Sequence, residues 1–170
     1  EGRFDAVLYR GGLPGAGWDR HTKRMLAGQL RDGVLVLNAG DGWSVIADGQ
    51  AASVYGQDAR RRGTLTKQQR VSPTLGAAPP RAAIVLFDGT SADHFNGAKV
   101  TEDGLLEVGG TTKVAVHDFR LHLEFRLPYM PHATGQGRGN SGVYIQQRYE
   151  VQILDSFGLE GVANECGGLY

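Results

Sequence analysis

The chain has 170 residues, of which 41% are hydrophobic, and its 18 basic side chains balance its 18 acidic ones. A formal net charge of zero provides no long-range attraction for a phosphate backbone, and no apolar stretch approaches the roughly 20 residues that span a bilayer. Composition therefore favours a globular protein of one or two small domains, with no nucleic-acid partner and no membrane span.

Short β-forming runs separated by turn residues dominate the sequence. It contains 26 glycines, and five Asp-Gly pairs lie at intervals typical of hairpin turns. Only residues 19–30 could be read as a helix, and that run is short and interrupted by Gly28. The sequence predicts an all-β protein whose strands, in chain order, are 6–9, 33–37, 43–46, 84–87, 105–108, 119–127, 142–147 and 149–154.

A stretch rich in proline and alanine, "SPTLGAAPPRAA" at residues 72–83, has too little apolar surface for a core and reads as a linker. It predicts a small β-rich N-terminal segment at 1–78, the end of the linker at 79–83 and a second domain at 84–170. The first segment is thin for an independent core. We therefore expect it to pack against the second segment or against a part beyond this sequence.

Three of the expected strands alternate an apolar face with a face of amides, phenols, a histidine and single carboxylates. Each sugar hydroxyl requires both a donor and an acceptor, and planar amides supply both. The pattern thus favours a polyhydroxylated ligand, although the face could also simply be exposed to water. The polar residues are His122, Glu124, Asn140, Tyr144, Gln146, Glu150 and Gln152.

The spacing of the acids in "EVQILD" adds a further candidate. Asp155 can join the face of Glu150 and Gln152 only if a β-bulge absorbs the extra residue before it. The pattern E-x-Q-x-x-D resembles the E-x-D-x-x-E strand of laminarinase-type endoglucanases, in which two carboxylates flank the glycosidic bond. Here the middle acid is an amide and the last is a shorter aspartate, so that mechanism does not transfer directly.

Four consecutive motifs, "VLFDGTSADHF", "DGLLEVGG", "DFRLHLEFRLP" and "GRGNSGVYIQQRYEVQILDSFG", resemble the opening half of the bacterial 3-keto-disaccharide hydrolase family. The upstream "AVLYRGGLPGAGWD" resembles an N-terminal extension of some larger members. The resemblance implies a concanavalin-like, lectin/glucanase-type jelly-roll β-sandwich that continues past residue 170, so that the domain at 84–170 would be truncated. It also implies a secreted or periplasmic bacterial protein and a disulfide partner for Cys166 further along.

The chemistry implied by the resemblance is keto-assisted cleavage of a glycosidic bond. A ketone at C3 makes the C2 proton acidic, so a base can remove it while an acid assists departure of the C1 substituent, and later addition of water gives net hydrolysis. We expect Glu150 to be the base or general acid–base, with His122 or Glu124 as its catalytic partner. Sugar hydroxyls or the enolate would be bound by Asn140, Tyr144, Gln146, Arg148, Gln152 and Asp155, with Arg148 joining only if no turn intervenes at 147–149.

Other functions remain open at this stage. No cofactor is certain, and a divalent metal held by His122 and the carboxylates is an alternative for which no ligand spacing is diagnostic. A noncatalytic carbohydrate-binding module would use the same fold and face, and a structural or adhesive surface protein would use the Gly-rich N-terminal segment. Trp18 and Trp43 both lie outside the expected cleft, which favours the enzyme over the binding module. The sequence leaves the sugar, the linkage and the oligomeric state open.

Overall fold

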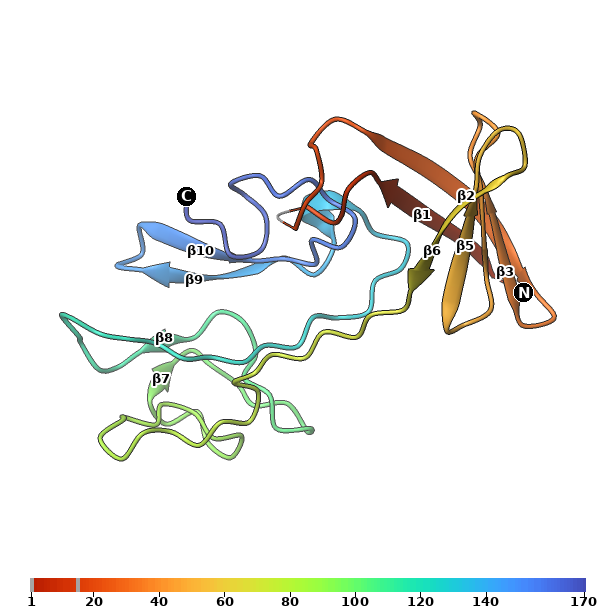
Figure 1. Cartoon of the computed structure of the whole chain (residues 1–170). Coiled ribbons are helices and arrows are strands. Elements are labelled where there is room, and N and C mark those ends of the chain that lie inside the picture. Colours follow the sequence, from red (N-terminus) through yellow and green to blue (C-terminus); the bar gives the residue numbers. More distant parts are fainter. Residues whose placement is uncertain (1, 15) are drawn as a thin grey trace. The chain divides into compact units, whose positions relative to one another are not determined.

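The computed structural model describes residues 2–14 and 16–170. These residues form antiparallel sheets and a single 3-10 turn at Gly135–Gly137 (Figure 1), so the all-β, jelly-roll-like prediction is confirmed. Contacts divide the chain into two compact units, one of Glu1–Arg70 with Pro128–Tyr170 and one of Val71–Leu127. The boundaries expected from the linker, 1–78 and 84–170, stay a prediction.

A six-stranded antiparallel sheet occupies the N-terminal part of the first unit, and each strand pairs with the next in sequence. Asp32 and Gly33, both at positive φ, form the tight hairpin turn that their sequence predicts. Leu26, Leu37, Val45 and Val54 form the buried core on one face. The strands are β1 (Arg3–Tyr9), β2 (Lys23–Arg31), β3 (Val34–Asn38), β4 (Ser44–Ala47), β5 (Ala51–Tyr55) and β6 (Arg61–Thr66).

The same unit contains a second, smaller sheet, the hairpin of β9 (Ser141–Ile145) and β10 (Tyr149–Ile153). Residues 168–170, called here the return segment, run along the other side of β10. Glu150 exchanges two backbone hydrogen bonds with Tyr170, at 2.9 and 3.1 Å, and the Gln152 N–H donates to the Gly168 carbonyl at 2.8 Å. The chain reaches the return segment through the return loop, defined as residues 154–167.

The second unit has little regular structure. Its only strands among the described residues are β7 (Phe95–Asn96) and β8 (Thr111–Thr112), which pair with each other. The strands expected at 84–87, 105–108 and 119–127 are wrong, because no described segment pairs with these runs as a ladder. Phe119 and Phe125, on the apolar face of the expected strand at 119–127, are 49% and 51% exposed. Alternation alone does not make a strand without a hydrogen-bonded neighbour.

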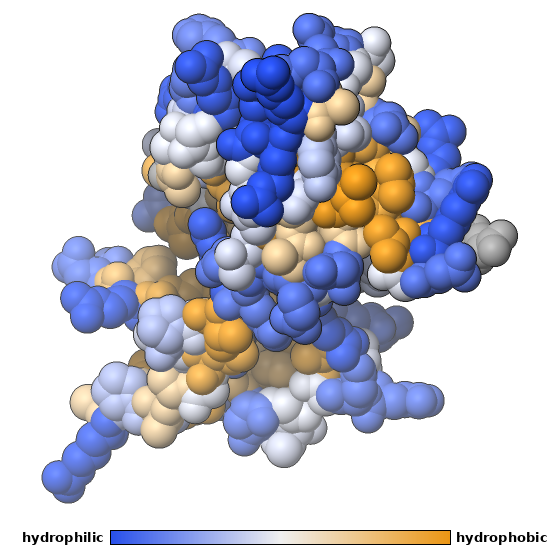
Figure 2. Space-filling view, turned by 45° about the vertical axis from the view of Figure 1, so that its right-hand side comes forward, coloured by the Kyte–Doolittle hydropathy of each residue, from blue (hydrophilic) through white to orange (hydrophobic). Residues whose placement is uncertain are grey.

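Large apolar side chains remain exposed in both units, and Figure 2 shows such patches between hydrophilic residues on one face. The buried hydrophobic residues of the described chain are few: Leu26, Leu37, Val45, Val54 and Leu154. No helix in the described residues has the length and hydropathy needed to cross a membrane.

Candidate functional site

Three polar side chains lie side by side across β9, β10 and the return segment. Tyr144 and Glu150 are register partners, and Glu150 and Tyr170 are joined by their backbone hydrogen bonds. Opposite residues of antiparallel strands share a face. The Tyr144 hydroxyl donates to Oε2 of Glu150 at 2.6 Å, and only 8% of Glu150 is exposed. The row Tyr144–Glu150–Tyr170 therefore holds a nearly buried carboxyl group between two phenols.

Gly142 leaves the space that the Glu150 carboxylate occupies. The glycine lies diagonally opposite Glu150, in register with Gln152. A Cβ at this position would overlap Oε1 and the carboxyl carbon of Glu150. The absence of a side chain at Gly142 thus lets the carboxylate lie flat on the hairpin.

Gln152 continues the polar face one position further along β10 and is 1% exposed. Its amide nitrogen lies 3.2 Å from Oε1 of Gln136, 3.1 Å from the Tyr170 hydroxyl and 3.4 Å from the Asn164 carbonyl, so its two N–H groups are shared among three acceptors. Its amide oxygen is buried and has no partner among the described atoms. An unpaired buried acceptor costs about 1–3 kcal/mol, so a buried water molecule is the natural partner of this oxygen.

The electrostatics of the row come from hydrogen bonding and burial. The hydrogen bond to the Glu150 carboxylate raises the pKa of Tyr144, because it holds the phenol proton in place. Burial, followed by the nearby Glu150 carboxylate, raises the pKa of Tyr170. Both phenols therefore stay protonated over the physiological pH range, and the Tyr144 hydroxyl faces Glu150 as a hydrogen-bond donor rather than as a charge.

Two further predicted residues lie around this row. Asn140 donates through its amide nitrogen to the Gln136 carbonyl at 2.9 Å and to Gln136 Oε1 at 3.2 Å, which links it to Gln152. Asp155 forms an ion pair with Arg138, whose Nε lies 3.1 Å from Oδ2. Because β10 ends at Ile153, Asp155 reaches this position by leaving the strand and not through the bulge that the spacing required.

Gln146 and Arg148 lie in and just after the β9–β10 turn. Gln146 and Gln147 have φ angles of 54° and 56°, and the Arg148 N–H donates to the Ile145 carbonyl at 3.1 Å. The expected strand at 142–147 therefore ends earlier, at Ile145. Because this turn intervenes, Arg148 does not join the strand face of Glu150. The Arg148 guanidinium lies 5.8 Å from the Tyr149 ring centroid.

His122 and Glu124 belong to the second unit. Nε2 of His122 lies 3.4 Å from Oε1 of Glu124, and the same oxygen accepts the Gly76 N–H at 2.5 Å. Their role as catalytic partners of Glu150 stays a prediction. Within 2–14 and 16–170, no three His, Cys, Asp or Glu side chains gather in a way that could hold a metal ion.

Sequence reasoning missed Gln136, Arg138, Asn164 and Tyr170. Gln136 lies in the 3-10 turn, and the other three lie in irregular segments or in the short return segment, where no periodicity marks a face. Gln136 and Arg138 precede the predicted residue Asn140 by four and two positions, so their proximity in sequence was the one available signal.

The fold and this row together define an all-β domain whose antiparallel strands present amides, phenols and one carboxylate on a shared face. A family model described as the 3-keto-alpha-glucoside-1,2-lyase-like domain matches residues 82–170, more than half of the chain. The chain belongs to this family, which confirms the resemblance drawn from its motifs. Comparisons with curated proteins and with solved structures found no match.

Proposed function

We propose that the protein cleaves the glycosidic bond of 3-keto-glycosides or 3-keto-disaccharides, with Glu150 as the base. The carboxylate takes the C2 proton, and the C–H electron pair forms the enolate with the C3 oxygen. When the ketone re-forms, a C1–C2 double bond appears, the C1–O bond breaks and the leaving oxygen takes a proton. Addition of water to C1 then gives net hydrolysis.

The observation that supports this proposal is the Glu150 carboxylate, 2.6 Å from the Tyr144 hydroxyl in a domain of this family. Elimination next to a ketone needs one positioned base, and the hydrogen bond from the Tyr144 hydroxyl holds the Glu150 carboxylate in one orientation. Asn140, which is exposed, supplies an amide for a sugar hydroxyl.

The test is incubation of the protein with a panel of 3-keto-disaccharides and their unoxidised parents, followed by product analysis. We expect cleavage of the keto sugars alone, with exchange of the C2 proton in D₂O. Glu150→Gln should lower the rate by about 10²–10⁴-fold, as loss of a general base does. Glu102→Gln, a change at an exposed glutamate of the second unit, is the matched control.

Two results would contradict the proposal. Binding of both sugar sets without cleavage of either would make the polar row a recognition surface of a carbohydrate-binding module. Normal cleavage by Glu150→Gln would remove Glu150 from the role of base.

A further inference from the structure

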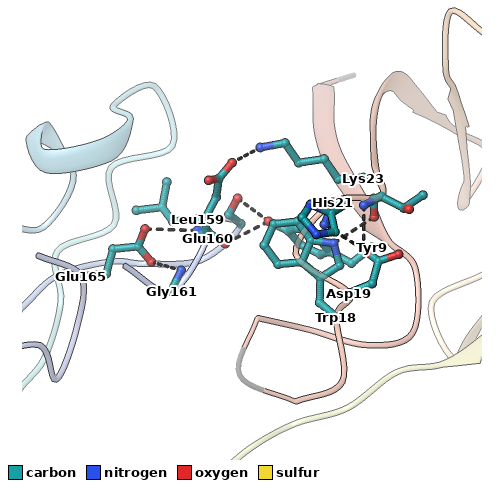
Figure 3. Close-up of polar contacts among 11 residues, drawn as sticks. Tyr9, Trp18, Asp19, His21, Lys23, Leu159, Glu160, Gly161 and Glu165 are labelled. Atoms are coloured by element: carbon teal, nitrogen blue, oxygen red, sulfur yellow. Dashed lines mark hydrogen bonds and ion pairs between the residues drawn. The ribbon is translucent and has the colours of Figure 1, made fainter. Parts of the chain in front are cut away.

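Two side chains of the N-terminal sheet contact the return loop, and they lie opposite each other in register. Tyr9 ends β1 and pairs with Lys23, the first residue of β2. The Tyr9 hydroxyl lies 2.6 Å from the Gly158 carbonyl and 3.0 Å from that of Leu159, and the Lys23 ammonium forms an ion pair with Glu160 (Figure 3). These contacts join parts of the chain about 140 to 150 residues apart and belong to the first unit.

Contacts that do not involve the return loop hold Tyr9 and the start of β2 in place. The Tyr9 ring packs edge-on against Trp18, with centroids 4.8 Å apart, and the Trp18 indole donates to the Thr22 carbonyl at 2.9 Å. The Asp19 carboxylate accepts the backbone N–H groups of His21 and Thr22, and these bonds lower its pKa to about 2. The residues leading into β2 are thus ordered independently of the return loop.

The return loop is held together internally by the buried carboxylate of Glu165. Glu165 is 8% exposed and accepts the backbone N–H groups of Glu160 at 3.1 Å and of Gly161 at 2.6 Å. The next residue along, Cys166, donates its N–H to Ser156 Oγ at 2.8 Å. A displacement at Glu160 is therefore transmitted through Glu165 to the whole loop.

The far side of the loop touches the polar row. The Asn164 carbonyl accepts from the side-chain amides of Gln136, at 2.8 Å, and of Gln152, at 3.4 Å. The Gly167 N–H donates to the Gln152 carbonyl at 2.9 Å, and the chain then continues to Tyr170. The return loop therefore contacts Tyr9 and Lys23 on one side and Gln152 on the other, and it leads directly to Tyr170.

We infer that the N-terminal sheet is a positioning element for the polar row: Tyr9 and Lys23 hold the return loop, which in turn holds Gln152 and Tyr170. The expected effect on catalysis rests on the proposed function, whereas the expected effect on the order of the return loop does not. The inference gives a role to the first 70 residues, which lie outside the family match.

The test compares the full chain with the double variant Tyr9→Phe/Lys23→Met. The changes remove a hydroxyl and a charge but keep the ring against Trp18 and the alkyl stem. Tyr55→Phe/Lys67→Met makes the same two changes elsewhere on the sheet and is the matched control. Amide hydrogen exchange should become several-fold faster at residues 156–170, including Gly167, while β3–β5 keep their protection. The control should exchange like the wild type.

Restoring the ion pair provides an independent check. Lys23→Glu should loosen the loop, and the reversed pair Lys23→Glu/Glu160→Lys should recover its protection. On a cleaved keto sugar, Tyr9→Phe/Lys23→Met should lower kcat several-fold, and the reversed pair should recover the kcat that Lys23→Glu loses.

Unchanged exchange at 156–170 in the double variant, or equal acceleration in β3–β5, would overturn the inference. A loosened loop with unchanged kcat would overturn its catalytic half. If the wild type cleaves no keto sugar, the proposed function fails, and the exchange pattern still decides whether the sheet positions the loop.

Discussion

Gly142 and Glu150 occupy diagonal positions of the β9–β10 hairpin, and the carboxylate fills the space that a side chain at Gly142 would take. Gly142→Ala should push the carboxylate off the hairpin and break its bond to Tyr144. We expect kcat/KM on a cleaved keto sugar to fall by at least about tenfold, and stability to fall by about 1–3 kcal/mol, as in other overpacked sites.

Gly63→Ala is the control for this change, because a Cβ at Gly63 meets nothing within 4 Å. Steady-state kinetics and urea unfolding of both variants give the comparison. Wild-type kinetics in Gly142→Ala would show that the position of the carboxylate against the hairpin is irrelevant to the reaction.

Tyr144 makes the alkaline stability of the protein depend on Glu150. Its raised pKa means that the folded protein holds the phenol proton more tightly than the unfolded chain, whose value is about 10. The resulting stabilisation is complete below about pH 10 and is lost as the pH rises through the raised value. Tyr144→Phe should therefore flatten the fall in Tm above pH 10, and Glu150→Gln should lower the pKa of Tyr144 in a tyrosinate absorbance titration.

Tyr129→Phe, at a side chain that is 91% exposed, is the matched control for the Tm series. An unchanged alkaline slope in Tyr144→Phe would mean that the hydrogen bond to Glu150 does not govern the ionisation.

At the scale of elements, the hairpins that could be predicted are those with an unambiguous turn. Asp32-Gly33 marked the β2–β3 turn correctly, and "EVQI" marked most of β10. The run at 19–30 was misjudged: the sequence allowed a helix, and the structure has an Asp19 turn followed by β2. β5 and β6 were missed because alanine, serine and arginine carry little β-propensity of their own, and the sheet supplies the pairing.

Gly28 shows why the helical alternative failed. As a helix residue it reads as an interruption, whereas in β2 it lies opposite Leu37, where a Cβ would overlap the Val36 carbonyl. A glycine inside a strand often marks a close backbone approach of this kind. That approach depends on the neighbouring strand, so a single sequence does not show it.

Replacing Gly28 by alanine should therefore destabilise the N-terminal sheet. In an open strand position the same change stabilises by about 0.5–1 kcal/mol, because glycine loses more backbone entropy on folding. Here the backbones of β2 and β3 must move apart, which we expect to cost about 1–3 kcal/mol. Urea unfolding should show a lower midpoint for Gly28→Ala and an equal or higher one for Gly63→Ala, and a higher midpoint for Gly28→Ala would contradict the close approach.

At the scale of the whole molecule, the all-β class and the family followed from the sequence, since both depend on local motifs. The polar row followed only in part. Tyr144, Glu150 and Gln152 obey strand parity, whereas Tyr170 joins the row through a loop that contacts Tyr9 and Lys23. Such long-range contacts produce no periodic pattern in the sequence.

The association of the N-terminal sheet with the C-terminal strands can be tested by cutting the chain between them. Arg70 and Arg81 lie in a fully exposed stretch, residues 66–83, so brief trypsin treatment should cleave there first. Because Glu1–Arg70 and Pro128–Tyr170 form one compact unit, we expect the fragments to elute together in gel filtration at low salt. Salt near 1 M should weaken the complex, since it screens the exposed Lys23–Glu160 pair, and Lys23→Met should have the same effect at low salt. Clean separation of a folded N-terminal fragment at low salt would show that the sheet is an independent domain and not a support for the polar row, and it would contradict the expectation that residues 1–78 pack against another part of the protein.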